Sequence, residues 1–219
     1  MYDDITFYLF TFLSLSEKDF HILIKNLVGG DIMAIKIYID QGHNPENPNA
    51  GAEGNGYREQ DIVYRIGILL RDLLLQNGNF EVRVSRPTIT TQLGTSTLTS
   101  LSTRVNAANS WGADYFISLH TNASTSSIPS GTEAYVFSIP SAASELADNI
   151  VRNISEETGL RNRGVLARPS LYILRRTAMP AVLCELGFIS NPRDASLMAN
   201  SPGLFANAIY EGILDYFDL

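Results

Sequence analysis

The sequence predicts an α/β protein with a mostly parallel sheet of about six strands and helices on both faces. Six short apolar segments have the length of strands, and they are centred near Ile35, Val82, Tyr115, Ala134, Tyr172 and Val182. Segments with helical periodicity separate them, and the clearest is residues 58–75, where apolar side chains recur every three or four positions. Strands that alternate with helices are typical of parallel sheets, so we expect this architecture.

Three further helices are expected, and two of them carry recognisable end signals. Ser141 is expected to cap a helix that ends at Gly159. Asn191 followed by Pro192 predicts the start of another helix, because proline suits the first helical position. A last amphipathic helix is expected over about residues 204–217.

Composition excludes several classes of protein. The chain has 219 residues, which suits one ordinary domain, and its charged and hydrophobic fractions of 18% and 45% are those of a globular protein. A net charge of −7 argues against a nucleic-acid partner. No apolar stretch is long enough to span a bilayer as a helix, and a single cysteine, Cys184, excludes an internal disulfide. We expect a monomer without a membrane span.

The first 32 residues do not fit the predicted domain. The segment from Ile5 to Leu15 is apolar, like the centre of a signal peptide, but Asp3 and Asp4 precede it and no small-x-small cleavage site follows. We therefore predict that residues 1–32 are a dispensable extension, with Met33 as the biological start and residues 33–219 as the catalytic domain. No export route is indicated.

Candidate site residues stand where three apolar strands end. The first strand leads to His43, the second to His120, and residues 181–184 lead to Glu185. Because the carboxyl ends of parallel strands meet at one edge of a sheet, these three side chains are expected to converge. Two imidazoles with carboxylates describe a zinc site of the hydrolytic kind.

A zinc hydrolase needs a third protein ligand, and Glu59 is the best candidate. It precedes the apolar stripe of the helix over residues 58–75 on the side that faces the core. A glutamate in a first helical turn can also serve only the helix dipole, although Asp61 is available for that. Glu46 and Glu53 in the preceding loop remain alternative ligands.

These residues belong to an ordered set of motifs. The set consists of residues 39–43 (IDQGH), 57–59 (YRE), Arg104 with Ala108-Asn109, 117–123 (ISLHTNA), Arg163-Gly164, 171–175 (LYILR) and 180–191 (PAVLCELGFISN). In this order, from about residue 34 to the C-terminus, the chain resembles the zinc-dependent N-acetylmuramoyl-L-alanine amidases of the Amidase_3 type. That family's fold is a twisted six-stranded sheet. Cys184 departs from the family pattern, which usually has an aliphatic residue there, and we expect it to pack as a small apolar group.

The resemblance implies both a site and a substrate. It implies that His43, Glu59 and His120 bind one zinc ion and that Glu185 is the catalytic acid and base. It also implies that the protein acts at the bacterial cell wall on peptidoglycan, at the amide bond between N-acetylmuramic acid and L-alanine. Asn122 and Arg175 are candidate substrate contacts, and Arg163 and Arg168 are alternative partners for stem-peptide carboxylates.

Two other functions use the same residues. A zinc peptidase of the carboxypeptidase kind shares the ligand chemistry, and a non-catalytic wall-binding module is the third alternative. The pattern does not distinguish roles in prophage lysis, sporulation or cell separation, and it does not define a stem-peptide preference.

Overall fold

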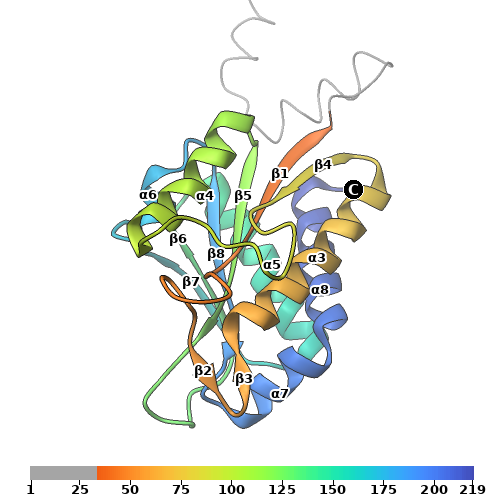
Figure 1. Ribbon diagram of the computed structural model, residues 1–219. Coiled ribbons are helices and arrows are strands. Elements are labelled where there is room, and N and C mark those ends of the chain that lie inside the picture. Colours follow the sequence, from red (N-terminus) through yellow and green to blue (C-terminus); the bar gives the residue numbers. More distant parts are fainter. Residues whose placement is uncertain (1–33) are drawn as a thin grey trace, which may run out of the picture.

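A six-stranded sheet forms the centre of the computed structural model, which describes residues 34–219 (Figure 1). The strands follow the order β4-β1-β5-β8-β6-β7 across the sheet. Their bounds in that order are Phe80–Val84, Ile35–Gln41, Tyr115–Asn122, Ala181–Phe188, Thr132–Val136 and Asn162–Ala167. The strands β1, β5 and β8 are almost completely buried, which explains why they read as continuous apolar runs.

The sheet is mostly parallel, as the sequence predicts. Strands β4, β1, β5 and β8 all run in one direction. Strand β6 is antiparallel to β8, and β7 is parallel to β6. The start of β6 therefore lies at the same edge of the sheet as the ends of β5 and β8.

Three long helices cover one face of the sheet, on the right in Figure 1. They are α3 (Glu59–Asn77), α5 (Ala142–Thr158) and α8 (Pro202–Phe217). Their buried residues join those of the sheet in one large apolar core. The predicted helix ends are confirmed, because Ser141 caps α5, Gly159 ends it in a left-handed conformation, and Asn191 caps α7 (Pro192–Asn200).

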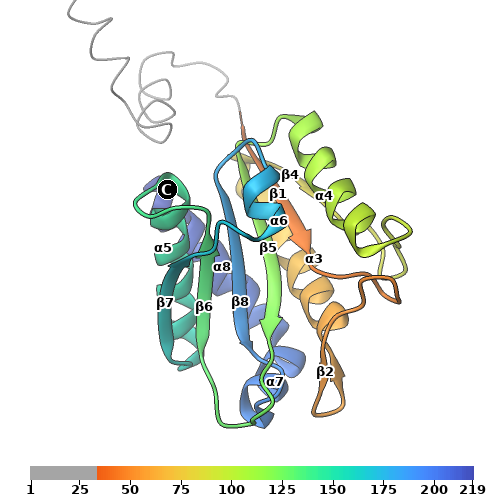
Figure 2. The ribbon, with the colours of Figure 1, turned by 90° about the vertical axis from the view of Figure 1, so that its left-hand side faces the viewer.

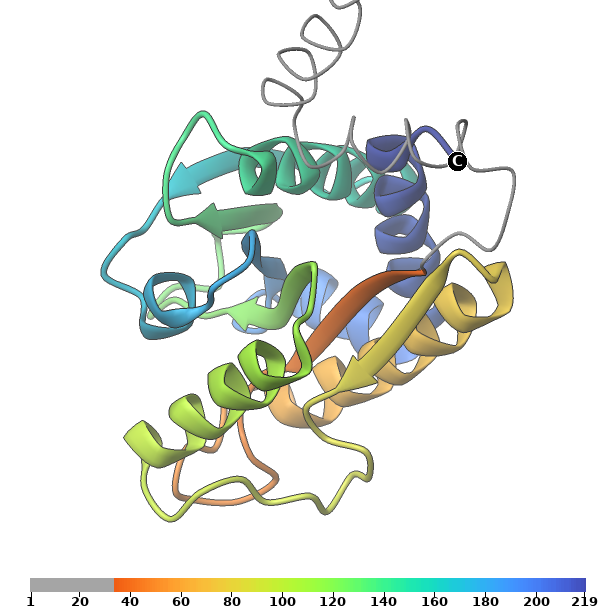
Figure 3. The same ribbon diagram turned by 90° about the horizontal axis from the view of Figure 1, so that it is seen from above.

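The other face is covered by α4 (Thr97–Trp111) and the short α6 (Tyr172–Arg176), as the turned views show (Figures 2 and 3). Their apolar side chains form a second, smaller core with Tyr38, Phe116 and Leu183 of the sheet. Farther along the same face of β5 and β8 the apolar residues give way to His120 and Glu185. A two-stranded hairpin of β2 (Glu53–Gly54) and β3 (Tyr57–Arg58) leads into α3.

One predicted strand is wrong. The apolar segment near Tyr172 is helix α6, and the sixth strand is β7, which lies in the basic segment before it. A short apolar run does not distinguish a helix from a strand, and here Ile173 and Leu174 are both buried although they are neighbours in sequence. Strand β7 escaped detection because it is an edge strand with mostly exposed or half-buried residues.

The prediction about residues 1–32 falls outside the described part of the chain. Among residues 34–219, no helix has the length and the apolar character needed to cross a membrane.

Candidate metal centre

A row of polar side chains crosses three neighbouring strands at the edge where β5 and β8 end. His120 on β5 is paired in register with Glu185 on β8. On its other side Glu185 is paired with Glu133 on β6. Residues paired in register point to the same face of a sheet, so an imidazole and two carboxylates lie in line.

His43 reaches this row from the end of β1. It follows Gly42, whose backbone N–H donates to the carbonyl of Leu119 on β5 at 3.0 Å. The backbone of His43 is in the left-handed region with φ of 64°, and its ring packs edge-on against that of His120, with centroids 4.8 Å apart. A Cβ atom at position 42 would lie only 2.5 Å from Cε1 of His120. Glycine is therefore required where the two histidines meet.

Glu59, the first residue of α3, lies between the two histidines. Its Oε1 is 3.1 Å from Nδ1 of His120 and 3.3 Å from Nε2 of His43. The backbone N–H of Thr121 also donates to Oε1, at 2.9 Å, and the N–H of Ala52 donates to Oε2 at 3.0 Å. The residue is only 3% exposed, so its inward direction follows the stripe predicted from the sequence.

The alternative carboxylates lie elsewhere. Glu46, Glu53 and Asp61 each form an ion pair with the side chain of Arg58, at distances of 3.2, 3.6 and 3.7 Å. The side chains of Glu46 and Glu53 are 78% and 69% exposed. Of the three candidate ligands Glu46, Glu53 and Glu59, only Glu59 contacts the histidines.

The residues present fit a bound metal ion. One ligand atom from each of His43, Glu59 and His120 lies within 4.8 Å of the others. Two atoms here are buried and lack a hydrogen-bond partner among the described residues, Nδ1 of His43 and Oε2 of Glu185. Buried polar groups are rarely left unpaired unless a ligand or a chemical function uses them. A donor set of two histidines and one glutamate is one that zinc accepts.

The two glutamates at the centre have opposite electrostatics. Burial raises the pKa of Glu59, but the hydrogen bonds and charges of His120 and His43 outweigh it and hold this pKa below its ordinary value. The pKa of Glu185 is instead raised to about 8, first by burial and then by the negative charges of Glu59 and Glu133. Glu59 thus suits a charged ligand, while Glu185 can carry a proton near neutral pH.

Glu133 on β6 lies in the row beside Glu185 and is only 7% exposed. Its Oε1 accepts hydrogen bonds from Nδ2 of Asn122 at 2.8 Å and from the hydroxyl of Tyr135 at 2.5 Å. Nε of Arg163 donates to its Oε2 at 2.8 Å. The network adds Glu133 and Tyr135 to the candidate site residues, and the only signal in the sequence was a glutamate alternating with apolar residues.

The two predicted substrate contacts lie in different places. Asn122 ends β5 two residues after His120 and contacts Glu133. Arg175 is an exposed residue of α6 and lines a pocket of about 280 Å³ with Phe137 and Ala181. Ala181 begins β8 and Glu185 lies four residues farther along, so Arg175 is not brought together with the histidines.

Two histidines and a glutamate at the carboxyl edge of an α/β sheet, with a free carboxylate beside them, define the class of site found in mononuclear zinc hydrolases. The family model described as N-acetylmuramoyl-L-alanine amidase (Amidase_3) matches residues 37–215. The chain belongs to this family.

Curated relatives carry the same description. The chain is 36% identical over 169 residues to the N-acetylmuramoyl-L-alanine amidase CwlM of Bacillus licheniformis, a match that covers 76% of this chain and 62% of the relative. It is 32% identical over 169 residues to the sporulation-specific N-acetylmuramoyl-L-alanine amidase of Bacillus subtilis (strain 168), covering 76% and 61%. The chain thus spans less than two thirds of the length of these relatives.

Solved structures agree in fold. The catalytic domain of CwlV, an N-acetylmuramoyl-L-alanine amidase from Bacillus (Paenibacillus) polymyxa var. colistinus, superposes with a TM-score of 0.73 at 30% identity and covers 84% of this chain and 98% of that one. An N-acetylmuramoyl-L-alanine amidase from Clostridium difficile 630 gives a TM-score of 0.75 at 28% identity, with 84% and 97% covered. The predicted α/β class and family are therefore confirmed.

Proposed function

We propose that this chain is a zinc-dependent N-acetylmuramoyl-L-alanine amidase that hydrolyses the amide bond between N-acetylmuramic acid and L-alanine in peptidoglycan. The observation that carries the proposal is the convergence of His43, Glu59 and His120 beside the unpaired carboxylate of Glu185. The description of similar proteins as N-acetylmuramoyl-L-alanine amidases supports the choice of bond. The protein then acts at the bacterial cell wall.

His43, Glu59 and His120 would hold the metal ion. Zinc bound there lowers the pKa of water and polarises a carbonyl group. Glu59 contributes the negative charge of the ligand set, and hydrogen bonds from the backbone N–H groups of Thr121 and Ala52 fix its direction.

Glu185 would transfer the protons. Its carboxylate takes a proton from the attacking water and returns it to the leaving amine, so a single residue serves both steps. Its Oε2 is buried and has no hydrogen-bond partner among residues 34–219, so the protein itself leaves the hydrogen-bonding capacity of this atom unused.

Substrate contacts remain predictions. Asn122 is close enough to the row to contact the stem peptide, although its amide already donates to Glu133. Arg163 belongs to the same network, whereas Arg175 lies beyond the start of β8. Contact between Arg175 and substrate requires a peptide or glycan strand that extends along this face past α6.

The test is mass spectrometry of purified peptidoglycan after digestion by the zinc-loaded protein. We expect new L-alanine amino termini and intact glycan strands, with His43→Ala and His120→Ala as inactive controls. Release of only C-terminal amino acids would identify a carboxypeptidase instead, and the absence of any product would leave a binding module. Metal analysis should find about one zinc ion per chain, most of it lost in both histidine variants.

A further inference from the structure

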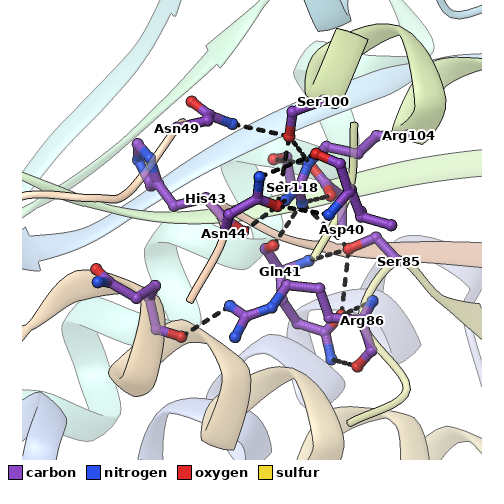
Figure 4. Close-up of polar contacts among 12 residues, drawn as sticks. Asp40, Gln41, His43, Asn44, Asn49, Ser85, Arg86, Ser100, Arg104 and Ser118 are labelled. Atoms are coloured by element: carbon purple, nitrogen blue, oxygen red, sulfur yellow. Dashed lines mark hydrogen bonds and ion pairs between the residues drawn. The ribbon is translucent and has the colours of Figure 1, made fainter. Parts of the chain in front are cut away.

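A buried arginine holds the backbone that carries His43. Arg104 lies on α4 and is only 1% exposed. Its Nη1 donates to the carbonyl of Gln41 at 2.6 Å, and its Nη2 donates to the carbonyl of His43 at 2.5 Å (Figure 4). One guanidinium group therefore donates hydrogen bonds to two carbonyl groups at the end of β1 and in the turn after it. One of these carbonyl groups belongs to His43, a proposed metal ligand.

Asp40 fixes the orientation of this guanidinium group. Its Oδ1 accepts from Nη1 of Arg104 at 2.6 Å, and both side chains are almost completely buried. Its Oδ2 accepts from the hydroxyl of Ser118 at 2.8 Å. Ser118 lies on β5 two residues before His120, so the ion pair is connected to both strands that carry the histidines.

His43 needs such support because its own backbone is strained. A residue with a Cβ atom disfavours the left-handed region in which His43 lies, with φ of 64°. The ring of His120 lies directly against Gly42, so the turn cannot relax towards β5. The direction of the His43 carbonyl group depends on this backbone conformation, and the hydrogen bond from Arg104 to the carbonyl oxygen stabilises that direction.

We propose that Arg104 is a positioning residue for the metal ligand His43 and that Asp40 keeps Arg104 in place. This inference rests on the proposed zinc site. Groups that orient a metal ligand typically change metal affinity by roughly 10–100-fold when they are lost. A lysine at position 104 keeps the charge, but its single ammonium group lacks the fork that reaches both carbonyl groups and Asp40 together.

A second buried arginine provides a matched control. Arg86 is 0% exposed and belongs to the same polar region. Its guanidinium group donates to the carbonyls of Gln60 at 3.0 Å and Ile89 at 2.9 Å, and to no carbonyl of a proposed ligand. The change Arg86→Lys removes an equally buried guanidinium group. It therefore measures how far a general loss of stability lowers zinc affinity.

The experiment compares Arg104→Lys, Arg86→Lys and the wild type, at a temperature where thermal melts show all three folded. Zinc dissociation constants are measured by chelator competition, and the absorption spectrum of the cobalt-substituted proteins reports ligand geometry. We expect zinc to bind roughly 10–100-fold more weakly to Arg104→Lys, with an altered cobalt spectrum. The variant Arg86→Lys should retain the zinc affinity and the cobalt spectrum of the wild type, even if its melting temperature falls by as much as that of Arg104→Lys.

The outcomes separate this inference from the proposed function. If the wild type does not bind zinc, or His43→Ala binds it as well as the wild type, the proposed metal site fails. If the wild type binds zinc through His43 but Arg104→Lys matches it in affinity and spectrum, Arg104 is only structural. An equal loss in Arg86→Lys also overturns the positioning role.

A second variant covers the case in which Arg104→Lys does not fold. Asp40→Asn keeps the size of the side chain and removes only its charge, which loosens Arg104 while leaving its two carbonyl contacts available. A smaller loss of zinc affinity in the same direction supports the proposal. Unchanged affinity in Asp40→Asn, or failure of both variants to fold, assigns Arg104 and Asp40 to stability alone.

Discussion

The carboxyl group of Glu185 makes the metal-free protein less stable as pH rises, and Glu185→Gln should remove this effect. In the folded protein the pKa of Glu185 is raised from 4.5 to about 8, by burial first and then by Glu59 and Glu133. Between these two values the unfolded chain is deprotonated while the folded chain holds a proton. The stability of the folded state therefore falls as pH rises through this window, and the full cost is present above about pH 8.

The size of the effect follows from the same values. One pKa unit corresponds to about 1.4 kcal/mol, so the shift corresponds to at most about 5 kcal/mol. Water reaches part of the half-buried side chain and screens the charges, so we expect roughly 2–4 kcal/mol. Glutamine keeps the size of the side chain, and the described residues provide no hydrogen bond to Oε2 that the change would break.

The assay is thermal unfolding of the chelator-treated wild type and Glu185→Gln at several pH values from 5 to 9. At pH 9 the variant should melt roughly 5–15 °C above the wild type, since 1 kcal/mol shifts a chain of this size by about 2–4 °C. At pH 5 the two should nearly coincide. Exposed Glu81 provides the control, because Glu81→Gln should follow the wild type at every pH. If Glu185→Gln does not melt above the wild type at pH 9, or if the difference in melting temperature increases as the pH is lowered, the carboxyl group of Glu185 is not buried among negative charges.

Three further changes test the site and the domain boundary. Glu59→Gln should lose zinc affinity and activity together, whereas Glu185→Gln should keep its zinc and lose roughly 10²–10⁴-fold in rate, measured as metal content and turnover on the same preparations. The reverse metal contents would exchange the two roles. Gly42→Ala should weaken zinc binding in chelator competition, because the added methyl group would lie 2.5 Å from the ring of His120; wild-type affinity would mean that the ring moves freely. A chain that begins at Met33 should give the wild-type circular dichroism spectrum, zinc content and activity, and insoluble protein would make the preceding residues part of the domain.

The positions of the site residues could be predicted because they follow from strand direction. The parallel strands β5 and β8 carry His120 and Glu185, and β1 leads to His43, so the three residues meet near one edge without any knowledge of loops, although β8 continues past Glu185 to Phe188. Glu59 could be predicted because the apolar stripe of α3 fixes which side of the helix faces the core.

Other features depend on contacts that no local pattern reveals. Glu133 lies beside Glu185 because β6 runs antiparallel to β8. The alternation of apolar and polar residues along β6 does not indicate in which direction the strand runs within the sheet. The segment near Tyr172 is helical, and as a helix it buries both Ile173 and Leu174 in the second, smaller core.

The reversed direction of β6 also has a consequence for how the opening of the site can vary among related chains. Strand β5 ends at Asn122 and β6 begins at Thr132, so both ends of the intervening loop are attached at the same rim. The loop is anchored near its start and middle by Ser190 and Asn191, while Ile128 is 86% exposed. Lengthening such a loop costs little, about 0.6 kcal/mol for each doubling, and it leaves the register of the sheet unchanged. Insertions here can change the surface beside the site while the strands keep His120 and Glu185 in place.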